Sequence, residues 1–339
     1  MITGILTLPL HNNFGGILQA YALCHILSNI IPQNEVYILT QKEKTFKGRL
    51  KKFLDYNSPA QKFIRQYIPI NTLSGFTLNE IMKKNITCIV VGSDQVWNTK
   101  YYNPLYFLNF LEDNHTIKKI SYAASLGSDL WYYSQQQTDE ISNLLNKFNA
   151  ISVRESSAIN LLQDNLKIKA TQVLDPTLLL QANHYNKFIS DDNKRYCYAY
   201  LLDYTKKLNM QVLKEIALQK KINIRKTELV KNKMIKRITP QTTVNQWLSN
   251  IYNASFVVTD SFHECVFSIL FNKEFVVLPH ELGGNARIKS LLKLFNLEER
   301  FVHHIDEINI QAPIYWDDVN YSLENLRKES INFLKSNLV

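Results

Sequence analysis

The sequence has few of the residues that build metal centres, redox centres and disulfide frameworks. Its 339 residues include only four cysteines, Cys24, Cys88, Cys197 and Cys265, and no two are close enough for a CxxC site. Each lies in an apolar stretch, which predicts buried, reduced thiols and a reducing compartment. Glycine and proline number nine each, so collagen-like and low-complexity classes are excluded.

Long hydrophobic runs and several well-known motifs are also absent. No stretch approaches the roughly 18 apolar residues of a membrane span, and the N-terminus lacks the basic start of a signal peptide. We therefore expect a cytoplasmic protein, with peripheral attachment to the inner face of the membrane as an option. GxGxxG, Walker A and HExxH motifs are missing, which weakens nicotinamide, P-loop and zincin interpretations. No metal site is expected.

What the sequence does contain is an alternation of short apolar runs with helical patterns. The predicted strands are Ile2–Leu8, Val36–Leu39, Thr87–Val91, Lys119–Ala123, Ala150–Val153, Thr171–Leu174, Cys197–Leu202, Ile222–Arg225, Phe256–Thr259 and Phe275–Leu278. This pattern predicts an α/β fold with doubly wound parallel sheets. The polar stretch Gln181–Arg195 is interpreted as a linker. We thus expect two Rossmann-like domains, 1–180 and 181–339, facing each other across a cleft, with the last helix packing back on the first domain as an option.

The sharpest candidate site follows the predicted strand Phe256–Thr259. Asp260 and Ser261 come directly after it, a helix begins at once, and His263 falls in the first turn. A helix N-terminus attracts phosphate or carboxylate, and Ser261 can cap the helix while touching an anion. An imidazole there can transfer protons near neutral pH. The alternative is an ordinary cap followed by a surface histidine.

Two further strand ends carry polar residues. Arg154 follows the strand Ala150–Val153 and can fork onto phosphate or carboxylate, unless it pairs with Glu155 or another neighbour. Asp94 follows a strand and a glycine and can bind or deprotonate a hydroxyl, and Trp97 can stack on a sugar face. A capping Asp and a core Trp explain the last two residues equally well.

Two turns that contain glycine complete the set of candidates. Asn12, Asn13 and Gly15 lie between a strand and a helix, and Asn amides suit polyol recognition. Arg287 and Lys289 follow a Gly-Gly pair and can add to an anion site. A plain strand-to-helix turn and a solvated basic helix face are the simpler interpretations of these two segments.

Taken together, these segments resemble the polysaccharide pyruvyl transferase family. The matches are short, but they occur in order along nearly the whole chain. They comprise Gly4–Thr7 with His11–Leu23, Val91–Asn98, Ile120–Ser125, Ser152–Glu155, Leu174–Leu180, Thr259–His263 and Arg287–Leu292. One position departs from the family pattern: the residue after the histidine is usually Gly, and here it is Glu264.

The resemblance implies a GT-B-like fold and transfer of a pyruvyl group from phosphoenolpyruvate to a sugar of a cell-surface polysaccharide precursor. The product is a pyruvate ketal, phosphate is released, and no cofactor beyond the co-substrate phosphoenolpyruvate is implied. The acceptor is expected to be a lipid-linked or nucleotide-linked sugar. The first domain is expected to bind the acceptor and the second to bind phosphoenolpyruvate.

The resemblance also implies roles for individual residues. His263 is implied as the acid/base and Arg154 as a contact to the donor. Asp94 is a secondary candidate for activating the acceptor hydroxyl. An electropositive pocket for the phosphate and carboxylate of the donor is expected to draw on Arg154, the helix start at Ser261 and Arg287. Phe262 and Lys289 are further candidates for substrate binding.

The formal net charge is +9, from 39 Lys and Arg against 30 Asp and Glu. Lys42–Arg65 mixes basic residues with apolar ones at helical spacing, which is typical of a helix on an anionic membrane or of a helix packed on its own domain. Lys206–Arg237 is typical of solvated helix and loop. No recognition motif accompanies these charges, so no nucleic acid partner is expected.

Two other functions stay open at this stage. A GT-B-type glycosyltransferase that uses a nucleotide-sugar has the same two-domain fold, and it needs a nucleoside pocket in the second domain. A non-catalytic binding protein of a biosynthetic complex has the fold without turnover. Thermal stabilisation by phosphoenolpyruvate, by nucleoside diphosphates or by neither distinguishes the three.

Overall fold

The computed structural model describes residues 1–11, 13–40, 55–68, 71–74, 76–111, 114–192, 194–202, 207–227, 242–280, 284–303 and 312–338. Asn12, the basic segment at 42–54 and part of the segment Lys206–Arg237 lie outside these residues. The predicted membrane helix and the predicted role of Asn12 therefore stay predictions.

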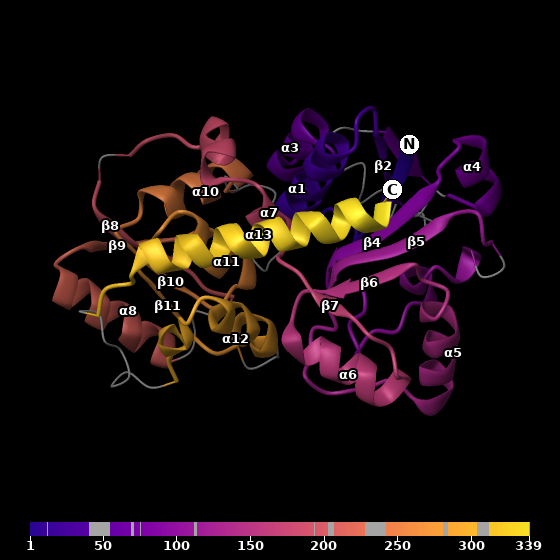
Figure 1. Cartoon of the computed structure of the whole chain (residues 1–339). Coiled ribbons are helices and arrows are strands. Elements are labelled where there is room, and N and C mark those ends of the chain that lie inside the picture. Colours follow the sequence, from indigo (N-terminus) through magenta and orange to yellow (C-terminus); the bar gives the residue numbers. More distant parts are fainter. Residues whose placement is uncertain are drawn as a thin grey trace. The chain divides into compact units, whose positions relative to one another are not determined.

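The chain divides into two compact units, whose elements are labelled in Figure 1. The first unit comprises Met1–Leu180 and Asn325–Val339, and the second comprises Gln181–Glu324. The C-terminal helix α13, Trp316–Leu338, begins in the second unit and ends in the first. The end of the chain therefore belongs to the same unit as its first strand.

The first unit is built on a seven-stranded parallel sheet of order β3-β2-β1-β4-β5-β6-β7. Its strands are β1 (Ile2–Leu6), β2 (Glu35–Thr40), β3 (Asn71–Ser74), β4 (Cys88–Asp94), β5 (Lys118–Ala124), β6 (Ala150–Val153) and β7 (Thr171–Gln172). Its helices are α1 (Phe14–Ile30), α3 (Pro59–Tyr67), α4 (Leu78–Lys83), α5 (Gln135–Leu145), α6 (Ser156–Leu166) and α7 (Pro176–Leu179). This is the Rossmann strand order with one strand added at the β7 edge.

The second unit is built on a four-stranded parallel sheet of order β11-β10-β8-β9. Its strands are β8 (Tyr196–Tyr200), β9 (Asn223–Lys226), β10 (Phe256–Thr259) and β11 (Phe275–Val277). Its helices are α8 (Lys207–Lys220), α10 (Val244–Asn253), α11 (Phe262–Leu270) and α12 (Asn285–Leu294). The α/β class and the two parallel-sheet units predicted from the alternation are confirmed.

The predicted linker at Gln181–Arg195 is wrong. Ala182–Phe188 forms a 3-10 helix, and within it the side chains of Tyr185 and Phe188 are buried. The Tyr185 ring meets the Phe267 ring of α11 edge-on, with centroids 5.1 Å apart. The segment is polar on average because only these two side chains face the core, and a stretch with so few anchors has no clear hydrophobic period.

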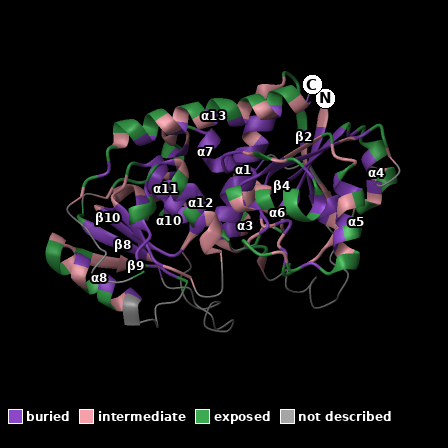
Figure 2. Cartoon of the chain, turned by 60° about the horizontal axis from the view of Figure 1, so that its bottom comes forward, coloured by how far each residue is buried: buried purple, intermediate pink, exposed green. Residues whose placement is uncertain are grey.

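Buried residues concentrate on the central strands and on α1 and α11 (Figure 2). Every residue of β4 is buried, as expected for a central strand covered on both faces. Helix α1 is seventeen residues long and buries thirteen of them, so it lies inside the unit rather than on its surface. The four cysteines are buried and unpaired, as predicted. Burial raises the pKa of the Cys24 thiol to about 12.

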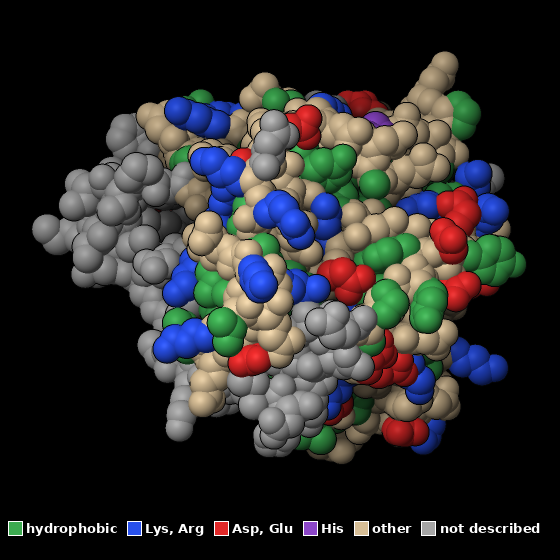
Figure 3. All heavy atoms as spheres, turned by 90° about the vertical axis from the view of Figure 1, so that its left-hand side faces the viewer, with side chains coloured by type: hydrophobic (Ala, Val, Ile, Leu, Met, Phe, Trp, Pro, Cys, Tyr) green, Lys and Arg blue, Asp and Glu red, His purple; other side chains and the backbone are tan. Residues whose placement is uncertain are grey.

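Described basic residues of the segment Lys206–Arg237 reach solvent at α8. Lys214 on α8 and Lys221 just after it are exposed. Figure 3 shows the side of Figure 1 on which α8 lies, where Lys and Arg side chains are spread among neutral ones, with acidic side chains between them. Among the described helices, none has both the length and the hydrophobicity needed to cross a membrane.

The two strand orders define where a site belongs in each unit. In open parallel sheets, ligands bind beyond the carboxyl ends of the strands, where the strand order reverses direction. In the first unit this switch point lies between β1 and β4, and in the second it lies between β8 and β10. The predicted residues that follow β4 and β10 therefore stand at the two positions that this fold class uses.

Candidate functional site

In the first unit, neutral hydrogen bonds join β1 to β4 at the switch point. Thr7, just after β1, donates its hydroxyl to the Ser93 carbonyl at 2.9 Å. Gln19 of α1 donates its side-chain amide to the Thr7 hydroxyl at 3.0 Å and accepts the Ser93 N–H at 3.2 Å. All three residues are buried. The backbone of Ser93 is thereby fixed, so the residue after it has a defined position.

Gly92 allows β4 to end in this way. Its φ is +121°, a conformation that residues with a Cβ rarely adopt. A Cβ at this position would lie 2.1 Å from the Tyr122 carbonyl oxygen of β5. Only glycine therefore lets β4 approach β5 here and place Ser93 and Asp94 at the carboxyl end of the sheet, which we call the edge of the unit.

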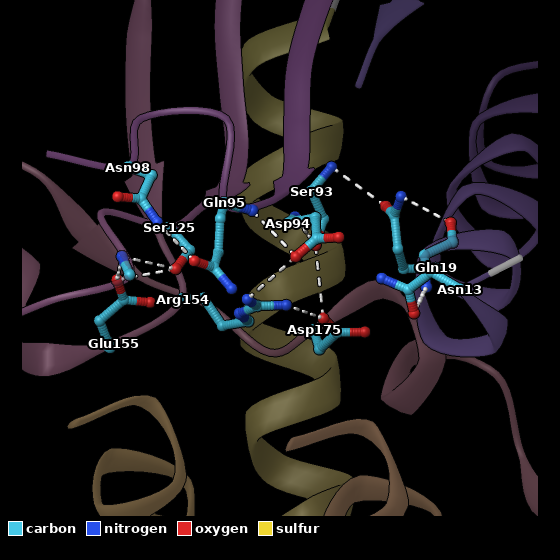
Figure 4. Close-up of polar contacts among 12 residues, drawn as sticks. Asn13, Gln19, Ser93, Asp94, Gln95, Asn98, Ser125, Arg154, Glu155 and Asp175 are labelled. Atoms are coloured by element: carbon cyan, nitrogen blue, oxygen red, sulfur yellow. Dashed lines mark hydrogen bonds and ion pairs between the residues drawn. The ribbon is translucent and has the colours of Figure 1, made fainter. Parts of the chain in front are cut away.

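Asp94 belongs to a buried cluster with one guanidinium and a second carboxylate (Figure 4). Arg154, directly after β6, donates from Nη1 to Asp175 Oδ2 at 2.8 Å, and its Nη2 lies 3.6 Å from Asp94 Oδ1. Asp94 Oδ1 also accepts the Gln95 N–H at 2.9 Å. Asp94 is 5% exposed and Arg154 is 4% exposed. The structure thus brings two predicted residues together with a third, Asp175, that was not predicted as a site residue.

The charges around Arg154 are mostly negative. Burial lowers the pKa of its guanidinium, but Asp175, Asp94 and Glu155 outweigh that effect, so the pKa is raised and the group stays charged. Three carboxylates thus surround one cation, and such a cluster repels an added anion. The structure favours the alternative interpretation of Arg154, an ion pair with neighbours, and the partners are Asp94 and Asp175 instead of Glu155.

Glu155 has a separate role in shaping the edge. Its Oε1 accepts the Ser125 hydroxyl at 3.0 Å, the Leu126 N–H at 2.8 Å and the Gly127 N–H at 3.3 Å. These bonds attach the loop after β5 to the end of β6. The buried Glu155 carboxylate therefore fixes the position of the loop after β5, which lies next to Asp94.

The predicted stacking of Trp97 on a sugar is wrong. Trp97 is 1% exposed, its ring stacks on Phe107 at 5.5 Å, and its Nε1 donates to the Tyr106 carbonyl at 2.9 Å. It is a core residue, which was the alternative interpretation. Asn13 is the N-cap of α1 and accepts the Gly16 N–H at 3.2 Å, while Gly15 is buried in the first turn.

In the second unit, a carboxylate itself joins the two strands of the switch point. Asp260, directly after β10, accepts the Leu202 N–H beyond β8 with both oxygens, at 2.8 and 3.1 Å. Thr259 also crosses over, donating its hydroxyl to the Tyr200 carbonyl at 3.0 Å. The Asp260 carboxylate thus has a structural role, because it joins the ends of β8 and β10.

Ser261 is the N-cap residue of α11, but its hydroxyl makes no capping bond in the described structure. The helix begins where it was predicted, but the predicted capping hydrogen bond of the Ser261 hydroxyl is not formed. The first turn of α11 presents its N–H groups and the positive end of the helix dipole at the sheet edge.

Phe262, His263 and Arg287 form one group at the start of α11. His263 is 7% exposed, and its ring meets the Phe262 ring edge-on at 5.2 Å. The Arg287 guanidinium lies over the Phe262 ring at 5.8 Å. Lys289 is two residues further along α12 and so projects to another side: it is exposed, with its ammonium 5.0 Å from the Phe301 ring. The structure brings Arg287, and not Lys289, to Phe262, the residue directly before the histidine.

A family model for polysaccharide pyruvyl transferase matches residues 13–281, a range that includes both sheet edges. The chain belongs to the polysaccharide pyruvyl transferase family. No curated protein matches it in sequence. The resemblance inferred from the short motifs is thereby confirmed for most of the chain.

Solved structures support the fold of this pyruvyl transferase family member. It is similar to the UDP-GlcNAc 2-epimerase from Neisseria meningitidis bound to UDP-GlcNAc, with 11% identity and a TM-score of 0.54, covering 99% of this chain and 100% of that one. It is also similar to the UDP-GlcNAc 2-epimerase from Methanocaldococcus jannaschii, with 11% identity and a TM-score of 0.53, covering 95% and 91%. This likeness shows a shared GT-B-like fold of two Rossmann-like domains.

The family member carries a buried acid next to its histidine. Glu264 is fully buried in α11, and burial raises the pKa of its carboxyl well above its ordinary value. The negative charge of Asp260 acts in the same direction, and Trp247 and Thr259 act against it. Burial therefore favours the neutral form of Glu264, the residue directly after His263, over its carboxylate form.

Several residues of the two edges were not predicted from the sequence. Thr7, Gln19, Ser93 and Asp175 each stand after a strand or in the helix that follows one, and that position is the signal that would find them. Among the described residues, no group of three His, Cys, Asp or Glu side chains is arranged to hold a metal ion.

Proposed function

We propose that this protein transfers a pyruvyl group from phosphoenolpyruvate to two hydroxyls of a sugar in a cell-surface polysaccharide precursor, and releases phosphate. The observation that carries the proposal is the group at the start of α11, where the Phe262 ring contacts both His263 and Arg287 in a chain of the pyruvyl transferase family. An acid/base, a cation and a helix N-terminus gathered at a switch point suit a small dianionic donor.

The charge of the second edge supports binding of the donor there. Arg287 and the start of α11 attract a phosphate and a carboxylate. Asp260 accepts the Leu202 N–H and burial favours the neutral form of Glu264, and both effects reduce the opposition of the nearby carboxyl groups to this attraction. We assign phosphoenolpyruvate to this edge and not to Arg154, which sits among three carboxylates.

The first edge supports activation of an acceptor hydroxyl. Both contacts described for the Asp94 carboxylate fall on Oδ1, from Arg154 and from the Gln95 N–H. We assign its Oδ2 as the base for the hydroxyl of a lipid-linked or nucleotide-linked sugar. A cluster with a net negative charge suits a neutral hydroxyl better than an anionic donor.

The chemistry follows from these assignments. The His263 imidazolium gives a proton to the methylene carbon of phosphoenolpyruvate, and the adjacent carbon becomes electrophilic. The first sugar hydroxyl attacks that carbon and gives its proton to Asp94. The bond from carbon to phosphate oxygen then breaks, phosphate leaves with the electron pair, and the second hydroxyl attacks the same carbon. One of the two hydroxyl protons replaces the proton lost by His263, and the other leaves on phosphate.

The test is phosphate release from phosphoenolpyruvate with a panel of UDP-sugars and undecaprenyl-diphosphate-linked sugars. We expect turnover by the wild type and a loss in kcat of about 10²–10⁴-fold in His263→Ala, the range for removing a general acid/base. His115→Ala, at an exposed histidine of the first unit, is the matched control and should retain full activity. Wild-type rates in His263→Ala would remove the histidine from the mechanism.

A binding measurement separates this proposal from a nucleotide-sugar enzyme of the same fold. We expect the melting temperature to rise with phosphoenolpyruvate in the absence of acceptor, because binding to the folded state stabilises it. Stabilisation by UDP or UDP-sugars alone, with no phosphate release from phosphoenolpyruvate, would instead favour a nucleotide-sugar enzyme. Stabilisation by neither, with no turnover, would favour a binding protein.

A further inference from the structure

Asp175 occupies a turn that is fixed from several sides. It is the N-cap of α7, and its Oδ1 accepts the Thr177 hydroxyl at 2.7 Å and the Thr177 N–H at 3.1 Å. Helix α13 holds the same turn, because Ser330 accepts the Leu174 N–H at 3.0 Å and Arg327 donates to the Leu178 carbonyl at 2.8 Å. The carboxylate therefore has a fixed position before any substrate binds.

The second oxygen of Asp175 faces the site. Asp175 Oδ2 accepts from Arg154 Nη1 at 2.8 Å and from the Ser93 hydroxyl at 3.3 Å. The Asp175 side chain has no exposed surface, so it does not itself touch a substrate. Its influence on the chemistry must therefore pass through Arg154 and Ser93.

Arg154 is held unequally by its two carboxylates. The 2.8 Å contact to Asp175 is a full charge-assisted hydrogen bond, whereas the 3.6 Å contact to Asp94 is a looser ion pair. A guanidinium bound bidentately to Asp94 would occupy both oxygens and weaken that carboxylate as a base. Asp175 competes for the guanidinium and so keeps it on Oδ1 of Asp94 alone.

Other charged and titratable groups face this cluster from each packed element. Glu155 from the end of β6 contributes to the charge around Arg154. Tyr122 from β5 donates its hydroxyl to the Leu174 carbonyl at 3.0 Å, and burial raises its pKa, with the Asp175 charge adding to that rise. A buried neutral phenol does not neutralise Asp175, so the carboxylate is left for Arg154.

We propose that Asp175 is a positioning residue for Asp94: it fixes Arg154 so that the guanidinium engages one oxygen of Asp94 and leaves the other for the acceptor hydroxyl. The inference rests on the proposed function. In the step it serves, the O–H bond of the hydroxyl breaks, the proton goes to Asp94 Oδ2, and the oxygen electron pair forms the bond to carbon.

The test is the pH–rate profile of Asp175→Asn, measured on full-length protein as phosphate release. We expect kcat to fall about tenfold to 100-fold, the scale for a misplaced catalytic group, with an unchanged KM for phosphoenolpyruvate. Without the Asp175 charge, the Arg154 guanidinium is left to Asp94 alone, so the pH–rate profile should shift together with the fall in kcat. Asp175→Glu, which restores the charge, should recover part of kcat and the wild-type profile.

A matched control and a milder variant keep the test decisive. Asp192→Asn removes a carboxylate that pairs with Arg225 at 2.6 Å on the second unit, and it should leave kcat and the profile unchanged. If Asp175→Asn does not fold, Thr177→Val removes one bond to Asp175 Oδ1 and should shift the profile in the same direction by less.

The outcomes separate the two proposals. Wild-type turnover with an unshifted profile in Asp175→Asn, or a fall in kcat that only matches the loss of folded protein, would overturn the positioning role and leave the proposed function standing. No turnover of phosphoenolpyruvate by the wild type would overturn the proposed function and this inference with it.

Discussion

The two sheet edges carry nearly the same residues in opposite order and use them differently. Strand β4 ends in Ser93 and then Asp94, whereas β10 is followed by Asp260 and then Ser261. In each case the first residue of the pair joins the two strands of the switch point. The second residue is the one presented at the edge.

This order decides the chemistry of each edge. In the first unit Ser93 makes the hydrogen bonds that join β4 to β1 and α1. The residue at the end of the strand is therefore the carboxylate Asp94, which lies in a cluster with Arg154 and Asp175. In the second unit Asp260 makes the hydrogen bond that joins β10 to the end of β8. The next residue is therefore Ser261 at the N-terminus of α11, followed by Phe262, which contacts His263 and Arg287. Parallel strands end at one edge in both units, but among the described residues the carboxylate that joins the strands is Asp260 of the second edge, whereas Asp94 of the first edge follows the joining residue.

The largest expected effect comes from Gly92→Ala, which should disrupt the end of β4 at the first edge. The new Cβ would meet the Tyr122 carbonyl oxygen at 2.1 Å, and the φ of +121° is unfavourable for alanine. We expect the free energy of unfolding to fall by about 3 kcal/mol or more, measured by urea denaturation. The second edge has Thr259 at the corresponding place and needs no glycine there.

Gly16→Ala is the control for this substitution. Gly16 lies in α1, and a Cβ there would come no closer than 3.3 Å, to the side chain of Asn13. We expect a change within about 1 kcal/mol, the scale of helix propensity. Equal stability of Gly92→Ala and the wild type would show that β4 can end without glycine, and the contrast with β10 would fail.

A smaller effect is expected from Arg287→Ala, which sharpens the assignment of the donor to the second edge. Removing a cation beside Phe262 and the start of α11 should raise KM for phosphoenolpyruvate about tenfold, or about 1.4 kcal/mol, in steady-state kinetics. Lys289→Ala is the matched control, because this lysine lies over Phe301 instead and should leave KM unchanged. Equal effects of the two substitutions would contradict the separation of their side chains.

Much of this arrangement was predictable from the sequence, because it depends on local pattern. Apolar runs predicted the strands, and the polar residues at their ends predicted the edges, where the structure places Asp94, Arg154 and His263. The family was also recognisable, since its short motifs occur in order. Local pattern does not show what a side chain faces, and so it left Trp97 open between a sugar contact and a core residue, whereas in the structure the ring packs on Phe107.

The unpredicted part consists of contacts between distant segments. Asp260 is committed to the joint because Leu202, 58 residues earlier, ends at the same place. Asp175 matters because Arg154, 21 residues earlier, reaches it across two strand ends. Neither distance follows from spacing, since both depend on which strands are neighbours in the sheet. Which of several carboxylates is structural and which is available is therefore a property of the fold.

The smallest expected effect concerns Glu264, the buried acid directly after His263. Its pKa is raised in the folded protein, so above the ordinary value of 4.5 the unfolded chain releases a proton that the folded protein retains. Stability from this group is therefore fully present below that pH and is lost as pH rises toward the folded pKa. Glutamine cannot ionise, so Glu264→Gln should melt a few degrees above the wild type at pH 8 and lose that advantage near pH 4.

The control for this substitution is Glu298→Gln, at an exposed glutamate of the same unit, which should shift the melting temperature equally at all pH values. Parallel curves for Glu264→Gln and the wild type between pH 4 and pH 8 would mean that Glu264 ionises normally. A full negative charge would then stand beside His263, and the second edge would no longer differ from the first in lacking an acidic group. The pH dependence of one buried side chain thus tests the contrast between the two edges.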